Sequence, residues 1–476
     1  MSTYSMRGLA RVSRLGMLAV ALIAAGTLGC DVNDKLLSAT DPDLINPSDL
    51  DTPEGATALR VGALRRWQLA TGGDNSNGRE STWLTGGLLA DEWATSSTFV
   101  QNDELDERRI KLDNSTVTFD FRKLEQVRTA VNQALPAMTK WRPTETANIA
   151  ELYLARGQAE MQLASDFCNG IPLSDGTTSP VTPGKQLMVA QVFDVAIATL
   201  DSGLALLPAN DASDIGRALR VIKARALLGN AKFSDARQTI DAISIPTDWT
   251  YNHTYAATSG SNAIWGQAMS GMRYLVGDSL EGNSRNLLVK NNIPFFSSQD
   301  PRVPANYTIN VKNGKADTTK SQDGLTYART TPLWGQETAV AVANGIDARL
   351  IEAEVAYHLD QDFPAALAIL NGLRSAQHKL GTITTPVMTP LVDPGTPDAR
   401  LTMLFREKAF WTFSRGQRLG DMRRLIRQYG LTADQVFPTG EHYRGGTYGT
   451  DVNLPVPKEE EFNNPNVTQS CLDRNA

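Results

Sequence analysis

The sequence is poor in the residues that build metal centres and disulfide frameworks. Its 476 residues include only three cysteines and four histidines. No C-x-x-C pair is present, and the histidines do not recur at the spacing of metal ligands. No glycine-rich phosphate-binding loop opens a helix either. We therefore predict no metal ion and no cofactor, and the class of small disulfide-rich scaffolds is excluded.

Catalytic signatures are also scarce. There is no G-x-S-x-G motif, and the histidines have no recognisable serine or aspartate partner motif. Carboxylate pairs such as Asp91 and Glu92 occur, but spacing alone cannot distinguish a glycosidase pair from surface acids. We predict that the protein is not an enzyme, and a lipid-anchored hydrolase stays open as an alternative.

Long apolar runs are missing except at the N-terminus. Arg7, Arg11 and Arg14 precede one apolar run of 14 residues, 15–28. A helix that spans a bilayer needs roughly 20 apolar residues, so residues 1–29 are predicted to be a secretory signal peptide. The run ends in Thr27-Leu28-Gly29-Cys30, which resembles a bacterial lipobox with Cys30 as the lipid-bearing residue. An ordinary cleaved signal near Cys30 is the alternative.

The predicted mature chain has an excess of acidic residues. Residues 1–29 hold three arginines and no acidic residue, so the rest carries 43 basic and 52 acidic residues, a net charge of −9. This balance argues against nucleic acid as a partner. Residues 30–51 form a polar, proline-containing tether. In an oxidising compartment, Cys168 and Cys471 are predicted to form a disulfide, with two buried free thiols as the alternative.

Most of the remaining chain shows the periodicity of amphipathic helices. Residues 71–118 and 246–343 are exceptions, because they are rich in glycine, asparagine and proline and lack this periodicity. We expect irregular structure there, with a few short strands at most, inside a single domain of residues 52–476. The predicted helices span 52–70, 119–139, 145–165, 188–207, 213–228, 234–243, 345–359 and 363–378, followed by two within 401–425.

Small residues recur at a fixed spacing within two of the predicted helix pairs. Ala224 and Ala236 are twelve positions apart, and so are Ala353 and Ala365. This spacing is similar to that of tetratricopeptide hairpins, in which small residues let paired helices approach closely. The predicted fold class is therefore all-α dominated, with a tetratricopeptide-like helical-hairpin scaffold at about 119–243 and 345–428 and long irregular insertions.

Residues 401–425 combine large apolar side chains with many charges. Glu407 and Asp421 are the acids available within this segment to Arg406, Arg418 and Arg424. We expect internal ion pairs between them, and a site for an anionic ligand is the alternative.

Three features together resemble one family. They are the lipoprotein signal, the motif 348–357 followed by 366–374, and the motif 406–424 that contains Arg406-Glu-Lys and Arg418-Leu-Gly-Asp421. The chain is similar to the RagB/SusD nutrient-uptake lipoproteins. The resemblance implies a SusD-like fold, a surface-exposed lipid anchor in the outer membrane, and a SusC-like TonB-dependent transporter as partner. The implied cargo is a nutrient, most often an oligosaccharide. A tetratricopeptide-type envelope scaffold without small-molecule cargo is the alternative.

Sugar rings have apolar faces edged by hydroxyl groups, so their sites need exposed flat aromatics beside polar side chains. Such residues cluster in the two irregular regions, although any one tryptophan could instead belong to the core. Trp67, Trp141 and Trp411 fit helix faces and are predicted to be core. The candidate ligand-binding residues are Asn75, Asn77, Trp83, Asp91, Trp93, Trp265, Arg273, Tyr274 and Trp334, with Trp249 in the same region.

Overall fold

The computed structural model describes residues 50–75, 81–312 and 315–476. The chain divides into two units, Met1–Thr52 and Pro53–Ala476, and the second contains the elements described below. The predicted signal peptide, most of the tether, Cys30 and Asn77 lie outside the described residues. Within the described residues, no helix combines the length and the apolar character needed to cross a bilayer.

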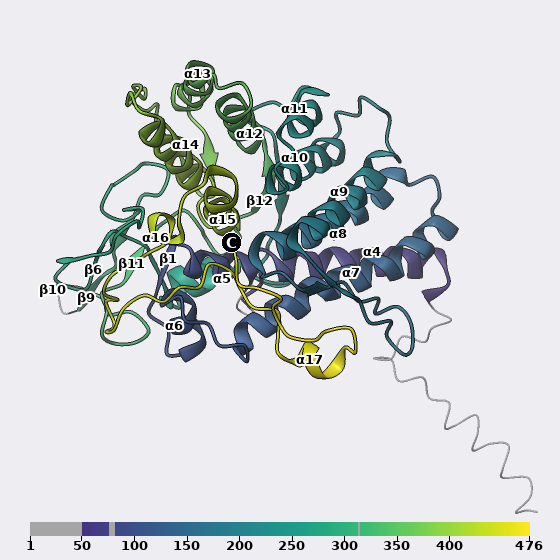
Figure 1. The fold of residues 1–476 in the computed structure, drawn as a ribbon, viewed down its shortest axis with the longest axis horizontal. Coiled ribbons are helices and arrows are strands. Elements are labelled where there is room, and N and C mark those ends of the chain that lie inside the picture. Colours follow the sequence, from purple (N-terminus) through teal and green to yellow (C-terminus); the bar gives the residue numbers. More distant parts are fainter. Residues whose placement is uncertain (1–49, 76–80, 313–314) are drawn as a thin grey trace, which may run out of the picture. The chain divides into compact units, whose positions relative to one another are not determined.

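Four long helices form the first part of the scaffold and lie side by side (Figure 1). They are α4 (Pro53–Ala70), α7 (Ser115–Trp141), α8 (Thr146–Asp166) and α9 (Val189–Leu204). Phe121, Leu124 and Val131 of α7 are buried at helical spacing, as an amphipathic helix requires. At Gly157 of α8, a Cβ atom would lie 2.5 Å from the side chain of Leu200, so glycine permits the close packing of α8 on α9.

Two helical hairpins follow, as the alanine spacing predicts. The first consists of α10 (Asp214–Gly229) and α11 (Phe233–Asp241), and the second of α12 (Gly345–His358) and α13 (Phe363–Arg374). Ala224, Ala236 and Ala353 are fully buried between the packed helices. The last pair is α14 (Pro397–Trp411) and α15 (Arg418–Tyr429). The prediction of a helix-dominated scaffold with repeated hairpins is confirmed.

Residues 71–118 are more regular than predicted. They contain α5 (Thr82–Leu89), β1 (Trp93–Thr95) and α6 (Val100–Asp106). All eight residues of α5 are buried. A helix that is buried on every side has no polar face, so its sequence lacks the periodicity by which amphipathic helices are recognised.

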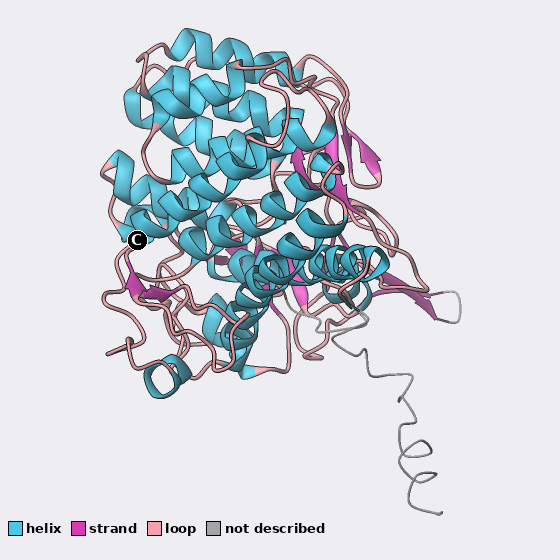
Figure 2. Cartoon of the chain, turned by 90° about the vertical axis from the view of Figure 1, so that its right-hand side faces the viewer, coloured by secondary structure: helices cyan, strands magenta, loops and turns pink. Residues whose placement is uncertain are grey.

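The second insertion, 246–343, contains more strands than predicted, together with a π-helix, η1 (Trp265–Ser270). Most of the strands lie beside the helices rather than among them (Figure 2). All described pairs are antiparallel: β1 with β5 (Tyr274–Val276), β4 (Thr250–His253) with β12 (Val340–Asn344), β6 (Leu280–Glu281) with β7 (Leu287–Leu288), β8 (Asn306–Tyr307) with β11 (Arg329–Thr330), and β9 (Ile309–Lys312) with β10 (Lys315–Thr318).

Shorter elements complete the fold. Two further antiparallel pairs lie outside the insertion, β2 (Ile171–Pro172) with β3 (Gln186–Leu187) and β13 (Lys379–Leu380) with β14 (Ile383–Thr384). The C-terminal region is mostly loop, as predicted, with the short helices α16 (Ala433–Val436) and α17 (Glu459–Asn463).

Segment 401–425 forms ion pairs mainly with distant parts of the chain, which corrects the prediction of internal pairs. Arg418 forms a bidentate pair with Asp91, at 2.7 and 2.9 Å. Glu407 accepts hydrogen bonds from Arg302 and Arg374. Only the Asp421–Arg424 pair joins an arginine and an acid of the predicted set. The segment is enclosed by other elements, so the nearest opposite charges come from those elements and not from its own sequence.

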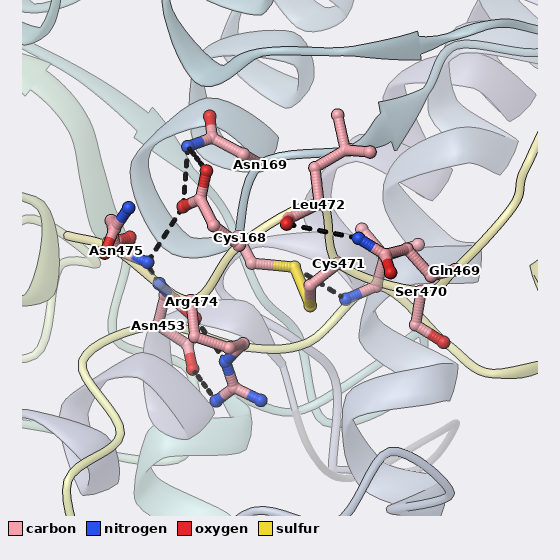
Figure 3. Close-up of a disulfide and its surroundings, with 12 residues drawn as sticks. Cys168, Asn169, Asn453, Gln469, Ser470, Cys471, Leu472, Arg474 and Asn475 are labelled. Atoms are coloured by element: carbon pink, nitrogen blue, oxygen red, sulfur yellow. Dashed lines mark hydrogen bonds between the residues drawn. A yellow bond between two sulfur atoms is a disulfide. The ribbon is translucent and has the colours of Figure 1, made fainter.

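A disulfide joins Cys168, just after α8, to Cys471 near the C-terminus (Figure 3). The two cysteines are the pair that the sequence singles out. Around the bond, the Leu472 amide donates to the Asn169 carbonyl at 2.8 Å, and the Asn169 side chain donates to both carboxylate oxygens of Asp473. The covalent bond and these hydrogen bonds fix the C-terminal segment against the start of the β2–β3 region.

Candidate functional site

An aromatic-lined cavity of about 270 Å³ lies where the second insertion meets the last helices. Arg302 and four stretches of chain contribute to its wall: 247–252, 333–346, 377–381 and 410–415. The first two carry the paired strands β4 and β12, the third carries β13, and the fourth is the end of α14 and the turn after it. The cavity is therefore formed jointly by an insertion and by the scaffold.

Three tryptophans contribute to the wall of this cavity. Trp334 and Trp249 are 5% and 9% exposed, and Trp411 lies deeper. The Trp249 Nε1 donates to Asp214 of α10 at 2.8 Å, which orients the indole ring. The ring of His378 packs edge-on against Trp411, with the ring centres 5.3 Å apart. These contacts hold the aromatic wall in place without a ligand, as a preformed site requires.

The position of Trp334 depends on contact between two loop segments. The Thr382 amide donates to the Leu333 carbonyl at 3.0 Å, and the Thr382 hydroxyl donates to the Pro332 carbonyl. At Gly381 the backbone has a positive φ of 52°, and a Cβ atom there would lie 2.0 Å from the Leu333 oxygen. Glycine is required at this position, because any side chain would separate the two segments.

Arg302 contributes a positive charge to the cavity wall, and nearby carboxylates neutralise this charge. The Arg302 guanidinium carbon is 5.0 Å from the ring centres of both Phe410 and Trp411. Asp300 and Glu407 accept hydrogen bonds from the same guanidinium. Burial alone would raise the pKa of Asp300, but the hydrogen bonds and positive charge of Arg302 outweigh burial and hold the pKa below its ordinary value. This arginine is therefore occupied by protein carboxylates and supports the rings.

The rim of the cavity is polar. Asp248, Thr250, Gln377 and Lys379 line it and are exposed. Aromatic walls with a few polar groups at the opening are suited to a ligand that has a flat apolar face and hydroxyl groups along its edge.

Four of the candidate ligand-binding residues lie in the core, which corrects their predicted role. Trp83, Trp93, Asp91 and Tyr274 are almost completely inaccessible. Trp93 packs against Phe413 with ring centres 4.9 Å apart. A Cβ at Gly416 would lie 1.9 Å from the Trp83 ring, so this backbone covers the indole directly. Asp91 is committed to Arg418. A ring that stacks on a sugar must line a cavity or the surface, whereas these rings are buried and do not line the cavity described above.

Three other candidates lie on a partly exposed surface. Asn75 accepts a hydrogen bond from Gln267 at 3.1 Å, and Trp265 begins the π-helix η1 beside them. The Arg273 guanidinium lies 4.7 Å from the ring centre of Phe99, which is 43% exposed. Single-turn π-helices are frequent at functional sites. The Asn262 amide donates to the Gln336 carbonyl at 2.8 Å, which connects the segment before η1 to the loop that carries Trp334.

Of the candidates, Trp334 is the one that lines the cavity, together with Trp249 of the same predicted region. Sequence reasoning missed His378 and Arg302, because neither belongs to a recognisable motif. Trp411 was predicted to be core, and it is buried, but its ring also contributes to the cavity wall. No group of metal-ligating side chains large enough to hold an ion occurs among the residues described.

Comparison with known proteins identifies the fold. No protein-family model and no curated protein matches the sequence. A SusD superfamily protein from Bacteroides vulgatus is similar in structure, with a TM-score of 0.60 and 15% identity over 88% of this chain and 99% of that chain.

Two further structures agree with this match. A SusD/RagB family protein from Bacteroides thetaiotaomicron has a TM-score of 0.61 at 12% identity, over 87% of this chain and 95% of that chain. Surface glycan-binding protein A from Bacteroides uniformis has a TM-score of 0.57 at 13% identity, over 88% and 99%. The chain therefore has the fold of the SusD/RagB proteins, as its motifs predict.

Proposed function

We propose that the protein is a binding protein that captures an oligosaccharide in the cavity lined by Trp249, Trp334 and Trp411. The observation that carries this proposal is the preformed aromatic wall with its polar rim. Structural neighbours named as carbohydrate-binding and glycan-binding proteins support the same ligand class. Neither name describes a catalyst, and we propose binding without turnover.

We also propose how the protein is anchored at the cell surface and which partner receives its ligand. Cys30 is the site of lipid attachment, residues 30–51 are the tether, and the bound glycan passes to a SusC-like TonB-dependent transporter in the outer membrane. The lipobox-like sequence and the fold support this part. Mass spectrometry of the N-terminal peptide tests lipidation, and co-purification of a TonB-dependent barrel tests the partnership. An unmodified Cys30 would contradict the anchor.

Isothermal titration against panels of oligosaccharides and oligopeptides tests the ligand class. The expected result is binding of an oligosaccharide without conversion. If no panel member binds and several envelope proteins co-purify, the cargo-free scaffold is the better interpretation. Turnover of any member would contradict the assignment as a binding protein.

One variant of the cavity rim and one of the aromatic wall test whether the oligosaccharide binds in this cavity. Asp248→Ala removes an exposed hydrogen-bonding group and should weaken binding about tenfold or more, because a hydrogen bond to a charged group contributes roughly 1.5–3 kcal/mol. Trp334→Phe shortens the aromatic wall and keeps an apolar ring in place. The control is Asp241→Ala, an exposed acid on α11 that does not line the cavity. Loss of binding in Trp265→Ala alone would move the site to the neighbouring surface.

A further inference from the structure

A second, much smaller cavity lies within the helical scaffold. Its volume is about 40 Å³, and it shares no lining residue with the candidate site. Helices α8, α10, α12, α14 and α15 contribute to its wall. One buried water molecule needs roughly 10–15 Å³ of cavity volume. The cavity therefore has room for only a few water molecules or small ions.

Two arginines of the cavity wall lack carboxylate partners. They are Arg225 of α10 and Arg427 of α15, and the Nη1 atom of each is inaccessible to solvent and without a hydrogen-bond partner in the described part of the chain. Arg427 donates only to the Gly229 carbonyl, at 3.3 Å through its Nη2. Burial lowers the pKa of each arginine to about 10, which leaves both charged at neutral pH. Both side chains are half-buried, and a charged nitrogen that is shielded from water without a partner is destabilising.

The carboxylates of the cavity wall are already committed to other cations. Asp347 accepts two hydrogen bonds from Arg415, at 3.0 and 2.7 Å. Asp421 accepts from Lys408 and Arg424, at 2.9 and 3.0 Å. Glu354, which does not itself line the cavity, accepts hydrogen bonds from the same Lys408 and Arg424. These groups balance one another and leave the charges of the two unpartnered arginines uncompensated.

One more cation adds to the imbalance. Arg423 is fully buried, donates only to the carbonyls of Ala164 and Ser165, and has unpartnered Nε and Nη2 atoms. Two nearby acids lie outside these ion pairs: Asp166, which accepts from Gln162 at 2.6 Å, and Asp473, which accepts from Asn169. Burial raises the pKa of Asp166 to about 7, so it is only partly ionised at neutral pH. Neither acid lines the cavity, and both carboxylates of the wall are already paired, so the wall offers no free carboxylate to Arg225 and Arg427.

The N-terminus of α15 also borders the cavity. Gln417 and Gly420 line it, and the N-cap residue Gln417 provides no side-chain cap to the first turn. The free amide groups of a first turn carry partial positive charge and favour an anion. This contribution has the same sign as that of the arginines.

We propose that this cavity binds one small monovalent inorganic anion of the size of chloride, held between Arg225 and Arg427. The anion supplies the negative charge that the surrounding carboxylates do not provide. It thereby links α10, the first helix of the first hairpin, to α15, whose Arg427 donates to the Gly229 carbonyl at the end of α10. The volume excludes an oligosaccharide or any other large ligand, so this site is independent of the proposed cargo site.

Thermal unfolding of the purified protein in mixtures of sodium gluconate and sodium chloride at constant ionic strength tests the proposal. Gluconate is too large for the cavity, so a rise in Tm that saturates with chloride is expected, since a ligand of the native state stabilises it by mass action. Arg225→Met should abolish this chloride response. The matched control is Arg220→Met on the same helix, whose guanidinium donates only to backbone carbonyls. This control should keep the response.

Bromide diffraction on the natural chain gives a result that does not depend on any variant folding. An anomalous peak between the guanidinium groups of Arg225 and Arg427 is expected in crystals soaked in sodium bromide. The proposal is overturned if no peak occurs there, or if the Tm of the natural protein depends on ionic strength alone. Either result would mean that water fills the cavity.

Discussion

Loss of the Cys168–Cys471 disulfide should lower the free energy of unfolding by several kcal/mol while leaving the fold intact. The bond closes a loop with a sequence separation of 303 residues. In the chain-entropy description, a loop of this length costs the unfolded state roughly 5–6 kcal/mol of conformational freedom, whereas measured effects of disulfides are commonly about 2–4 kcal/mol. We expect a decrease of about 3–5 kcal/mol.

The folded state should change little because noncovalent contacts hold the segment around Cys471. These contacts are the hydrogen bonds from Asn169 and the Arg474–Asp451 ion pair at 2.9 Å. Opening the disulfide therefore releases at most the C-terminal segment locally, but it frees most of the chain after unfolding. The stabilisation acts mainly through the unfolded state.

Urea titration of the oxidised protein and of the fully reduced protein measures the difference. The reduced protein should show a lower midpoint and a steeper slope, because its unfolded chain exposes more surface. Ser470→Ala is the control, since it removes a hydrogen bond to Glu461 in the same segment and keeps the disulfide. Equal free energies of unfolding for the two forms, with reduction verified by thiol counting, would refute the reasoning. Two free thiols in the unreduced, unfolded protein would refute the disulfide itself.

Two further predictions concern buried charges. The bidentate Arg418–Asp91 pair is almost fully buried, so Asp91→Asn or Arg418→Met alone should cost about 3–5 kcal/mol in urea unfolding. The double variant should cost clearly less than the sum, and strict additivity would contradict direct coupling. Burial raises the pKa of Glu92 from 4.5 to about 8, so the folded protein retains a proton that the unfolded chain releases. Its contribution to stability is therefore full below pH 4.5 and lost as the pH rises towards 8. Glu92→Gln should reduce the fall in urea midpoint between pH 5 and 8, and an unchanged fall would contradict this assignment.

The helices could be predicted because their signal is local. Apolar residues at helical spacing along 115–141 and 214–229 occur because one face of each helix packs and the other meets water. Local caps support the same helices: Ser213 and Asp362 each accept a hydrogen bond from an amide three residues ahead. Helix α5 was not predicted because it is buried on all sides, so its sequence has no contrast between an apolar face and a polar face.

The candidate site was only partly predictable because the local sequence does not determine whether a side chain is buried or borders a cavity. Trp83 and Trp334 both lie in stretches rich in glycine and threonine. The backbone of Gly416, more than 300 residues away, covers Trp83, whereas Trp334 borders a cavity closed by His378 and Trp411. No local pattern distinguishes the two tryptophans.

The sequence by itself determined the helical scaffold and its hairpins, and it singled out Cys168 and Cys471 as the candidate disulfide pair. Only the tertiary structure decided which charges neutralise one another and which aromatic rings border a cavity. Arg418 lies three residues from Asp421 but pairs with Asp91. Helix formation depends on residues within a few turns, whereas ion pairs and cavities depend on segments that are brought together by packing.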